Sequence, residues 1–160
     1  IKKIILTRPA VEAGESLGFL PGDLKEKIDP YLRPLYDALD DMIPSDKLNY
    51  FMQNRIIEIA PLAYMRGRTF KDSYIIADEM QNATPSQMKM LLTRLGQGSQ
   101  MVVTGDLQQA DRPSNNGLLE FLGLYNNFQG HRYVDLVKFD VQDVERHEAV
   151  KEILSIYGDS

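Results

Sequence analysis

The sequence predicts an α/β fold in which a mainly parallel sheet lies between helices. Three observations predict it. Short apolar, β-favouring runs alternate with amphipathic helical stretches along the chain. Two of these runs, which begin at Ser73 and Met101, lead into acids, Asp78 and Asp106. One clean helix separates them, so the three segments form the crossover unit of a parallel sheet.

The N-terminal part is expected to hold one strand and two helices. Lys3–Thr7 is an apolar run that Arg8-Pro9 ends. A short helix over Ala10–Leu17 and a turn cluster at Gly18–Asp23 follow. A longer helix starts at Asp29-Pro30, because proline suits the first helical position. Its inward face is expected to carry Tyr31, Leu35, Ala38, Leu39 and Met42.

A weaker helix and two strands come next. Lys47–Asn54 is expected to be helical, and Arg55–Ala60 to be a strand. The loop Pro61–Phe70 follows. The run Ser73–Ala77 then has few polar residues, which is typical of a strand buried on both faces in the interior of a sheet.

The helix between the two acid-tipped strands has strong local signals. Thr84 is expected to be its N-cap and Pro85 its first residue, and Gln87 closes a capping box. Gly96 is expected to end the helix. Its apolar stripe has helical spacing and consists of Met88, Leu91, Leu92 and Leu95.

The C-terminal part is expected to contain a loop, two helices and a strand. The loop Leu107–Asn116 is polar and long enough to be functional, and Asn116 is expected to cap a helix. Tyr133–Phe139 alternates weakly and predicts a last strand. Inward side chains are expected to be Leu118, Phe121, Leu122 and Tyr125 in the first helix, and Val150, Ile153, Leu154 and Tyr157 in the second.

The composition excludes several classes of protein. With 160 residues, 43% of them hydrophobic and 26% charged, the chain has the make-up of one globular domain, residues 1–160. No apolar run is long enough to span a membrane, and no cysteine is present for a disulfide or a thiolate metal site. These features fit a cytoplasmic protein. The net charge of −5 leaves nucleic-acid binding to a focused basic patch.

The acid pair Asp78-Glu79 is the strongest candidate site. In open α/β sheets, functional side chains follow the carboxyl ends of the strands. There an aspartate can hold Mg²⁺, and a neighbouring glutamate can orient or deprotonate a water. This arrangement is typical of the second half of a nucleoside triphosphatase site. The alternative is a solvated strand end that leads into a helix.

Several long runs match the motifs of a known family. They are Ile4–Glu15, Leu17–Asp23, Ile59–Thr69, Asp78–Asn82 and Val102–Asp106. Together they resemble the PhoH family of phosphate-starvation-inducible, ATP-binding proteins, which is similar to the core of superfamily 1 helicases. The resemblance covers nearly the whole chain. It implies a RecA-like P-loop NTPase core, a mainly parallel sheet flanked by helices, that hydrolyses ATP with Mg²⁺ in RNA metabolism.

The resemblance also implies roles for single residues. Asp78 would hold Mg²⁺, and Glu79 would polarise the attacking water. Gln81 matches a helicase glutamine that links the nucleotide site to the nucleic-acid groove. Gly105 and Asp106 begin the motif that ends at Gln109. In helicases the corresponding glutamine senses the terminal phosphate, so Gln109 would be the sensor.

Arg146 resembles the arginine of an Arg-His pair in the family, itself similar to a helicase motif that contacts the γ-phosphate. Its guanidinium would neutralise charge on the transferring phosphoryl group, in its own subunit or in a neighbour. A homo-oligomer, with a ring as one option, is therefore expected. The alternative for Arg146 is a surface ion pair with Glu145 or Glu148.

Three arginines are candidates for binding RNA or another single-stranded nucleic acid. Arg8, Arg66 and Arg68 lie at the ends of expected strands, on the same edge as Asp78. Together they would form the focused basic patch that binds phosphates. The alternative is that each of them pairs with one of the many acids of the chain.

The phosphate-binding loop G-x-x-x-x-G-K-[ST] does not occur in the sequence. In the family this loop lies upstream of the position of Ile1, with a strand that normally lies beside the Asp78 strand. The chain is therefore expected to be a piece of a longer protein. Two other functions stay open. One is an interaction module that docks RNA or protein without catalysis. The other is a metal-dependent nuclease that uses Asp78, Glu79, Asp106 and Asp111.

Overall fold

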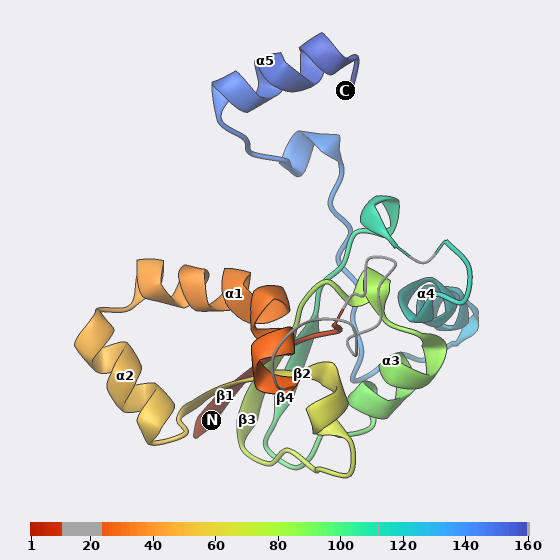
Figure 1. The fold of residues 1–160 in the computed structure, drawn as a ribbon. Coiled ribbons are helices and arrows are strands. Elements are labelled where there is room, and N and C mark those ends of the chain that lie inside the picture. Colours follow the sequence, from red (N-terminus) through yellow and green to blue (C-terminus); the bar gives the residue numbers. More distant parts are fainter. Residues whose placement is uncertain (11–23, 112, 160) are drawn as a thin grey trace. The chain divides into compact units, whose positions relative to one another are not determined.

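The computed structural model describes residues 1–10, 24–111 and 113–159. They form two compact units, 1–127 and 128–160. The first contains the sheet and four α-helices, and the second contains one α-helix (Figure 1). The expected helix Ala10–Leu17 and turn Gly18–Asp23 lie outside the described residues from position 11 onward.

The sheet of the first unit has four parallel strands in the order β2-β1-β3-β4. Their bounds are β1 Lys3–Arg8, β2 Ile57–Pro61, β3 Ser73–Ala77 and β4 Gln100–Val103. The predicted parallel α/β sheet is confirmed, and β3 lies in its interior. Because β1 and β4 occupy both sides of β3, the expectation that a further strand would lie beside the Asp78 strand is wrong for this sheet.

Helices cover both faces of the sheet (Figure 1). The helices α1 (Leu24–Met42) and α2 (Ser45–Gln53) pack on one face, and α3 (Pro85–Leu92) and α4 (Gly117–Asn127) on the other. Strand side chains alternate between the faces. The first core contains Leu6, Leu39, Leu48 and Ile57. The second contains Ile5, Ala60, Leu62, Met65, Phe70, Ile75, Ala77, Met80, Ala83, Met88 and Leu91.

The helix α1 begins earlier than expected. It starts at Leu24 and contains Pro30 and Pro34 inside its span. Residues 24–27 are good helix formers, which favours an extension upstream of the first proline. The inward face matches the prediction only in part, because Leu39 is buried as expected and Leu32 is buried in addition, whereas Ala38 and Met42 are exposed.

The cap of α3 is the predicted one, but its end is not. The Thr84 hydroxyl accepts from the Gln87 backbone N–H, and the Gln87 side chain accepts from the Thr84 N–H, which completes the capping box. The helix ends at Leu92 and not before Gly96. Instead, the Gly96 N–H donates to the Phe70 carbonyl over 2.7 Å. Leu95, predicted to be on the apolar stripe, lies past the helix end and is 47% exposed.

Short 3₁₀ turns follow three of the strands and lead the chain across the carboxyl edge of the sheet. They are η2 (Leu62–Met65) after β2, η3 (Met80–Asn82) after β3 and η4 (Leu107–Gln109) after β4. The predicted cap of α4 is confirmed, because the Asn116 side chain accepts from the Leu119 N–H over 3.1 Å. Leu118 and Phe121 of α4 pack against the second core.

The second unit has little buried apolar surface. It contains η5 (Val141–Asp143) and α5 (Glu148–Tyr157). The predicted C-terminal helix is present, although Val150, Ile153 and Tyr157 are exposed. The predicted strand Tyr133–Phe139 is wrong, because this segment is irregular and Tyr133 is 88% exposed. Its alternation was weak, and among the described residues no strand pairs with it. None of the helices in the described part combines the length and apolarity that a membrane crossing needs.

Candidate active site at the carboxyl ends of the strands

The register of the sheet brings three side chains together at its carboxyl edge. Thr7 is paired with Ala77, and Ala77 with Val103. The next residue on each strand, Arg8, Asp78 and Thr104, therefore lies in a row across the sheet. Two backbone hydrogen bonds extend the ladder into this row, from Asp78 to Thr7 and from Thr104 to Ala77, each over 2.9 Å.

Both carboxylate oxygens of Asp78 accept hydrogen bonds from this row. Arg8 donates to Oδ2 from Nε at 2.8 Å and from Nη2 at 2.6 Å, and the Thr104 hydroxyl donates to Oδ1 at 2.6 Å. Burial alone would raise the pKa of Asp78. The hydrogen bonds from Thr104 and Arg8, with the positive charge of Arg8, outweigh that effect and lower its pKa from the ordinary 3.8. Asp78 is therefore ionised and held in one orientation.

Glu79 is placed by an unusual backbone conformation. Its φ of 57° and ψ of 37° are left-handed, which is strained for a residue other than glycine. The turn separates its side chain from that of Asp78. One carboxylate oxygen, Oε1, lies 3.9 Å from Arg8 Nη2, and the other accepts from the Gln81 side-chain amide. With 39% of its side chain exposed, Glu79 can still meet a molecule from solvent.

Gln81 connects the ends of β3 and β4. It is only 1% exposed, and its Oε1 accepts from the Asp106 backbone N–H at 3.1 Å while its Nε2 donates to Glu79. Gly105 allows this close approach. A Cβ at that position would lie 3.0 Å from Gln81 Oε1 and 2.6 Å from a Leu118 methyl. The buried amide thus fixes Glu79 relative to the loop after β4.

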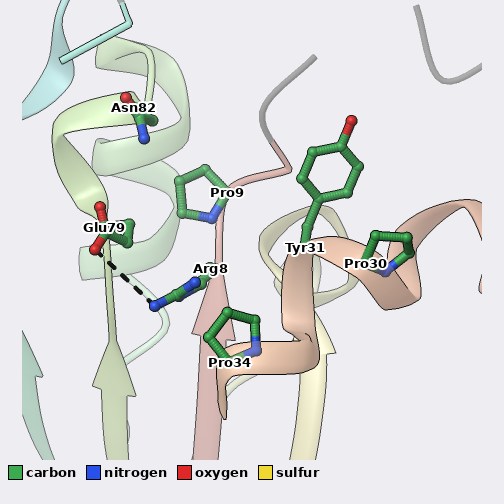
Figure 2. A pocket seen from close by; sticks show the side chains of 7 residues that line it. All are labelled: Arg8, Pro9, Pro30, Tyr31, Pro34, Glu79 and Asn82. Carbon is green, nitrogen blue, oxygen red and sulfur yellow. Dashed lines mark ion pairs between the residues drawn. The ribbon is translucent and has the colours of Figure 1, made fainter. Parts of the chain in front are cut away.

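A cavity of about 240 Å³ opens beside Arg8 and Glu79. Figure 2 shows Arg8 reaching from the end of β1 toward Glu79, with α1 on the other side. The walls combine polar groups with rigid apolar rings, and they consist of Arg8, Pro9, Pro30, Tyr31, Pro34, Glu79 and Asn82. Asp78 is not one of the lining residues, but it is ion-paired with Arg8, which is. Glu79 therefore lines a hollow at the carboxyl edge of the sheet, and Asp78 lies next to it through Arg8; the catalytic roles of the two acids stay predictions.

The oxygen atoms of the site are suitable ligands for a Mg²⁺ ion that binds together with a nucleotide. Mg²⁺ is commonly held by one or two carboxylates, with water and substrate phosphates completing the shell. The Asp78 carboxylate and the adjacent Thr104 hydroxyl supply hard oxygen ligands of this type, once Arg8 moves off Oδ2. Among the described residues, no three carboxylates or histidines form a group that could hold a metal by themselves. The four-carboxylate nuclease centre is therefore not found.

The remaining predicted residues are further from the acid pair or in the other unit. Asp106 caps η4, since its Oδ1 accepts from the Gln108 N–H at 2.9 Å. Gln109 is exposed at the end of this turn. Arg146 lies in the second unit and is exposed, with no ion pair to another described residue. Glu148, its expected partner in the alternative, pairs with Lys151 over 2.9 Å. The phosphate-sensing roles of Gln109 and Arg146 stay predictions.

The three arginines predicted to bind nucleic acid do not form one patch. Arg8 pairs with Asp78. Arg68 pairs with Glu58 over 2.8 Å and lies over the Phe70 ring, 4.7 Å from its centroid. Arg66 is exposed and lines a separate hollow with residues of α3. In this structure Arg8 and Arg68 are therefore paired with acids, which was the alternative to nucleic-acid binding.

Thr104 is the functional candidate that sequence reasoning missed. It stands directly before Gly105-Asp106, where the acid is the more obvious candidate. The sequence feature that could have identified Thr104 is its hydroxyl, one residue after an apolar run that was expected to form the strand next to the Asp78 strand. The pairing of Arg8 with Asp78 was also missed, because it depends on the register between β1 and β3, which are 70 residues apart at this contact.

Comparison with known proteins identifies the family. The sequence model of the family described as PhoH-like protein matches residues 1–158. A PhoH-like protein of Bacillus subtilis is 58% identical over 159 residues, covering 98% of this chain and 49% of the relative. A PhoH-like protein of Synechocystis is 52% identical over 157 residues, covering 97% and 47%.

More distant relatives extend the same match. Protein PhoH of Escherichia coli K12 is 43% identical over 162 aligned residues, which cover 99% of this chain and 45% of the relative. The chain spans about half the length of the curated relatives it matches.

Proposed function

The chain belongs to the PhoH family, and from that premise we propose that it takes part in Mg²⁺-dependent ATP hydrolysis coupled to RNA remodelling. The single observation that carries the proposal is the placement of Asp78 and Glu79 at the carboxyl end of an interior parallel strand, where Glu79 lines a cavity. Ligands of open α/β sheets bind at this edge.

Asp78 and Glu79 have separate tasks in this proposal. Asp78, ionised and oriented by Thr104, would hold Mg²⁺ with the Thr104 hydroxyl. Mg²⁺ bound with ATP would neutralise charge on the phosphates. Arg8 is the counterion of Asp78 in the present arrangement, and its guanidinium would turn toward the phosphates when the metal arrives.

Glu79 would position the attacking water. Its Oε2 is held by Gln81, whereas Oε1 faces the cavity side with Arg8 3.9 Å away. A water bound at Oε1 could give its proton to this carboxylate as it attacks the γ-phosphate. Because Gln81 also holds the Asp106 N–H, a shift of Glu79 would be felt by the loop that ends in Gln109. This contact supports coupling between hydrolysis and a bound nucleic acid.

The assembly and setting belong to the same proposal. We propose a homo-oligomer in which Arg146 completes an ATP site, in its own copy or in a neighbouring one, and a cytoplasmic location. These points rest on the family membership alone.

The test is the rate of ATP hydrolysis by protein expressed from its complete gene. We expect Glu79→Gln to lower kcat by about 100-fold or more while Mg²⁺-dependent ATP binding is retained, because a glutamine keeps the shape but cannot accept the proton. Glu120→Gln is the matched control, since Glu120 is exposed on α4. It should hydrolyse ATP at the parent rate.

Two outcomes would contradict the proposal. Equal rates for Glu79→Gln and the parent would remove Glu79 from the chemistry. A titration that shows no Mg²⁺-dependent heat with ATP would favour the interaction module over the enzyme.

A further inference from the structure

A second hollow, of about 330 Å³, lies beside α3 and shares no lining residue with the first cavity. We call it the α3 groove. It is lined by Arg66, Ser86, Lys89, Met90, Thr93 and Arg94. Three of these side chains are cationic, two carry hydroxyls and none is acidic, although the chain has a net charge of −5. Positive charge is therefore concentrated at this place.

The helix α3 builds one wall of the groove. Ser86, Lys89 and Thr93 recur at helical spacing, so they lie on one face, while Met88 and Leu91 are buried in the core. At 1.5 Å per residue, the polar row covers about 10 Å of the helix. Arg66 comes from the segment after η2, which packs against α3. The groove is thus part of a rigid surface.

Arg94 contributes a donor that no described residue satisfies. Its carbonyl accepts from the Phe70 N–H over 2.9 Å, which fixes its backbone, and its Nη2 lies 3.4 Å from the Thr93 hydroxyl. Its Nε is buried and has no hydrogen-bond partner in the described part of the chain. The side chain as a whole is only half-buried, so the guanidinium forms part of the groove wall while its stem is packed.

The other two cations are also available. Arg66 and Lys89 are exposed, and neither forms an ion pair with any residue that the structure describes. Arg8 and Arg68, in contrast, are each paired with an acid. From the sequence, Arg8, Arg66 and Arg68 were predicted to have the same role. Lys89 and Arg94 were assigned none.

We propose that the α3 groove binds the phosphodiester backbone of a nucleic-acid strand. The inference deepens the RNA part of the proposed function and rests on it. A row of cations and hydroxyls along a helix suits a ligand whose negative charge repeats. The described residues that line the groove are cationic, hydroxyl-bearing or aliphatic, so the contacts would go to the phosphates, which are the same in every sequence.

The experiment measures the binding of a fluorescein-labelled 12-nucleotide oligo(U) by fluorescence anisotropy, with protein expressed from its complete gene. The double variant Arg66→Gln/Lys89→Gln removes two exposed charges and keeps the length of the side chains. We expect its Kd to rise by about tenfold. Each lost phosphate contact on a single strand reduces the slope of log K against log salt by about 0.7, so the slope should fall by about 1.4.

The control is Lys47→Gln on α2, which covers the opposite face of the sheet. Lys47 is exposed, and its variant should bind oligo(U) with the parent Kd and salt slope. Thermal unfolding checks that all variants are folded. The rate of ATP hydrolysis without RNA should be unchanged in the groove variant, because these residues lie outside the first cavity.

The readouts separate the two proposals. Loss of oligo(U) binding with normal basal hydrolysis supports the groove. If Glu79→Gln keeps the parent rate while the groove variant loses oligo(U), the ATPase proposal fails and the groove stands. The groove proposal is overturned if its variant binds oligo(U) with the parent Kd and salt slope. It is also overturned if the variant loses poly-glutamate binding but keeps oligo(U), which would indicate an acidic protein partner.

Discussion

The strand-end site and the α3 groove are both charged, but they differ in how their charges are partnered. At the strand ends, Asp78 accepts from Arg8 and Thr104, and Glu79 accepts from Gln81. In the groove, cations line a hollow without acids. A closed network fixes its groups for chemistry, whereas open cations are ready for an external anion. The two sites therefore differ less in their residue types than in whether their charged side chains already have a hydrogen-bond or ion-pair partner.

Arg66 and Arg68 show the same contrast within three residues. Gly67 between them has a φ of +76°, a left-handed turn that suits glycine. Arg68 pairs with Glu58 and covers Phe70, while Arg66 stays exposed at the groove. Two identical side chains in one motif thus have different surroundings.

The largest difference should appear when a cation is replaced by an apolar side chain. Arg8→Met leaves the partly buried Asp78 with only the Thr104 hydroxyl and the Glu79 backbone N–H, and we expect the free energy of unfolding to fall by about 2 kcal/mol. Lys89→Met should change it by less than about 0.5 kcal/mol, because Lys89 is exposed and unpaired within the described residues. Urea unfolding at pH 7 measures both. Equal losses would erase the contrast between the sites.

A smaller difference is expected between the two arginines around Gly67. Arg68→Gln removes the ion pair with Glu58 and the contact with Phe70, which should cost about 1 kcal/mol of stability. Arg66→Gln should leave stability within about 0.3 kcal/mol of the parent but weaken oligo(U) binding. Urea midpoints and anisotropy on the same two variants check this. A stability loss in Arg66→Gln with unchanged oligo(U) binding would reverse the assignment.

The smallest expected effect is the pH dependence of the stability difference between the parent and Arg8→Met. Burial raises the pKa of Asp78, but hydrogen bonds from Thr104 and Arg8 lower it below its ordinary 3.8. The stabilisation is therefore complete at neutral pH and is lost progressively as the pH falls below 3.8 toward the folded pKa. Between pH 7 and pH 3 the stability difference between the parent and Arg8→Met should shrink in part. A difference that widens on acidification would show that Asp78 is not ionised by this network.

Local signals predicted most of the fold. The buried strand Ser73–Ala77 and the capping box at Thr84 depend on neighbouring residues, and both are present. The position of Asp78 and Glu79 followed from the end of that strand. These predictions succeeded because the interactions involved lie within a few residues of one another.

The errors arose where distant parts of the chain decide the outcome. Tyr133–Phe139 alternates, but a strand also needs a neighbour with free hydrogen-bonding groups. The helix α3 ends at Leu92, and the segment beyond it hydrogen-bonds to Phe70, which is distant in the sequence. The partners of Arg8 and Arg68 depend on strand register, which composition and spacing do not contain.

The left-handed backbone of Glu79 sets folding against chemistry at one position. Asparagine or glycine would adopt this left-handed turn at lower energetic cost. If only the stability of the fold mattered, glutamate would therefore be a poor choice at this position. If the proposed function is right, glutamate is retained at position 79 because ATP hydrolysis requires its carboxylate. Position 79 is thus a place where a variant library selected for yield and one selected for turnover would diverge.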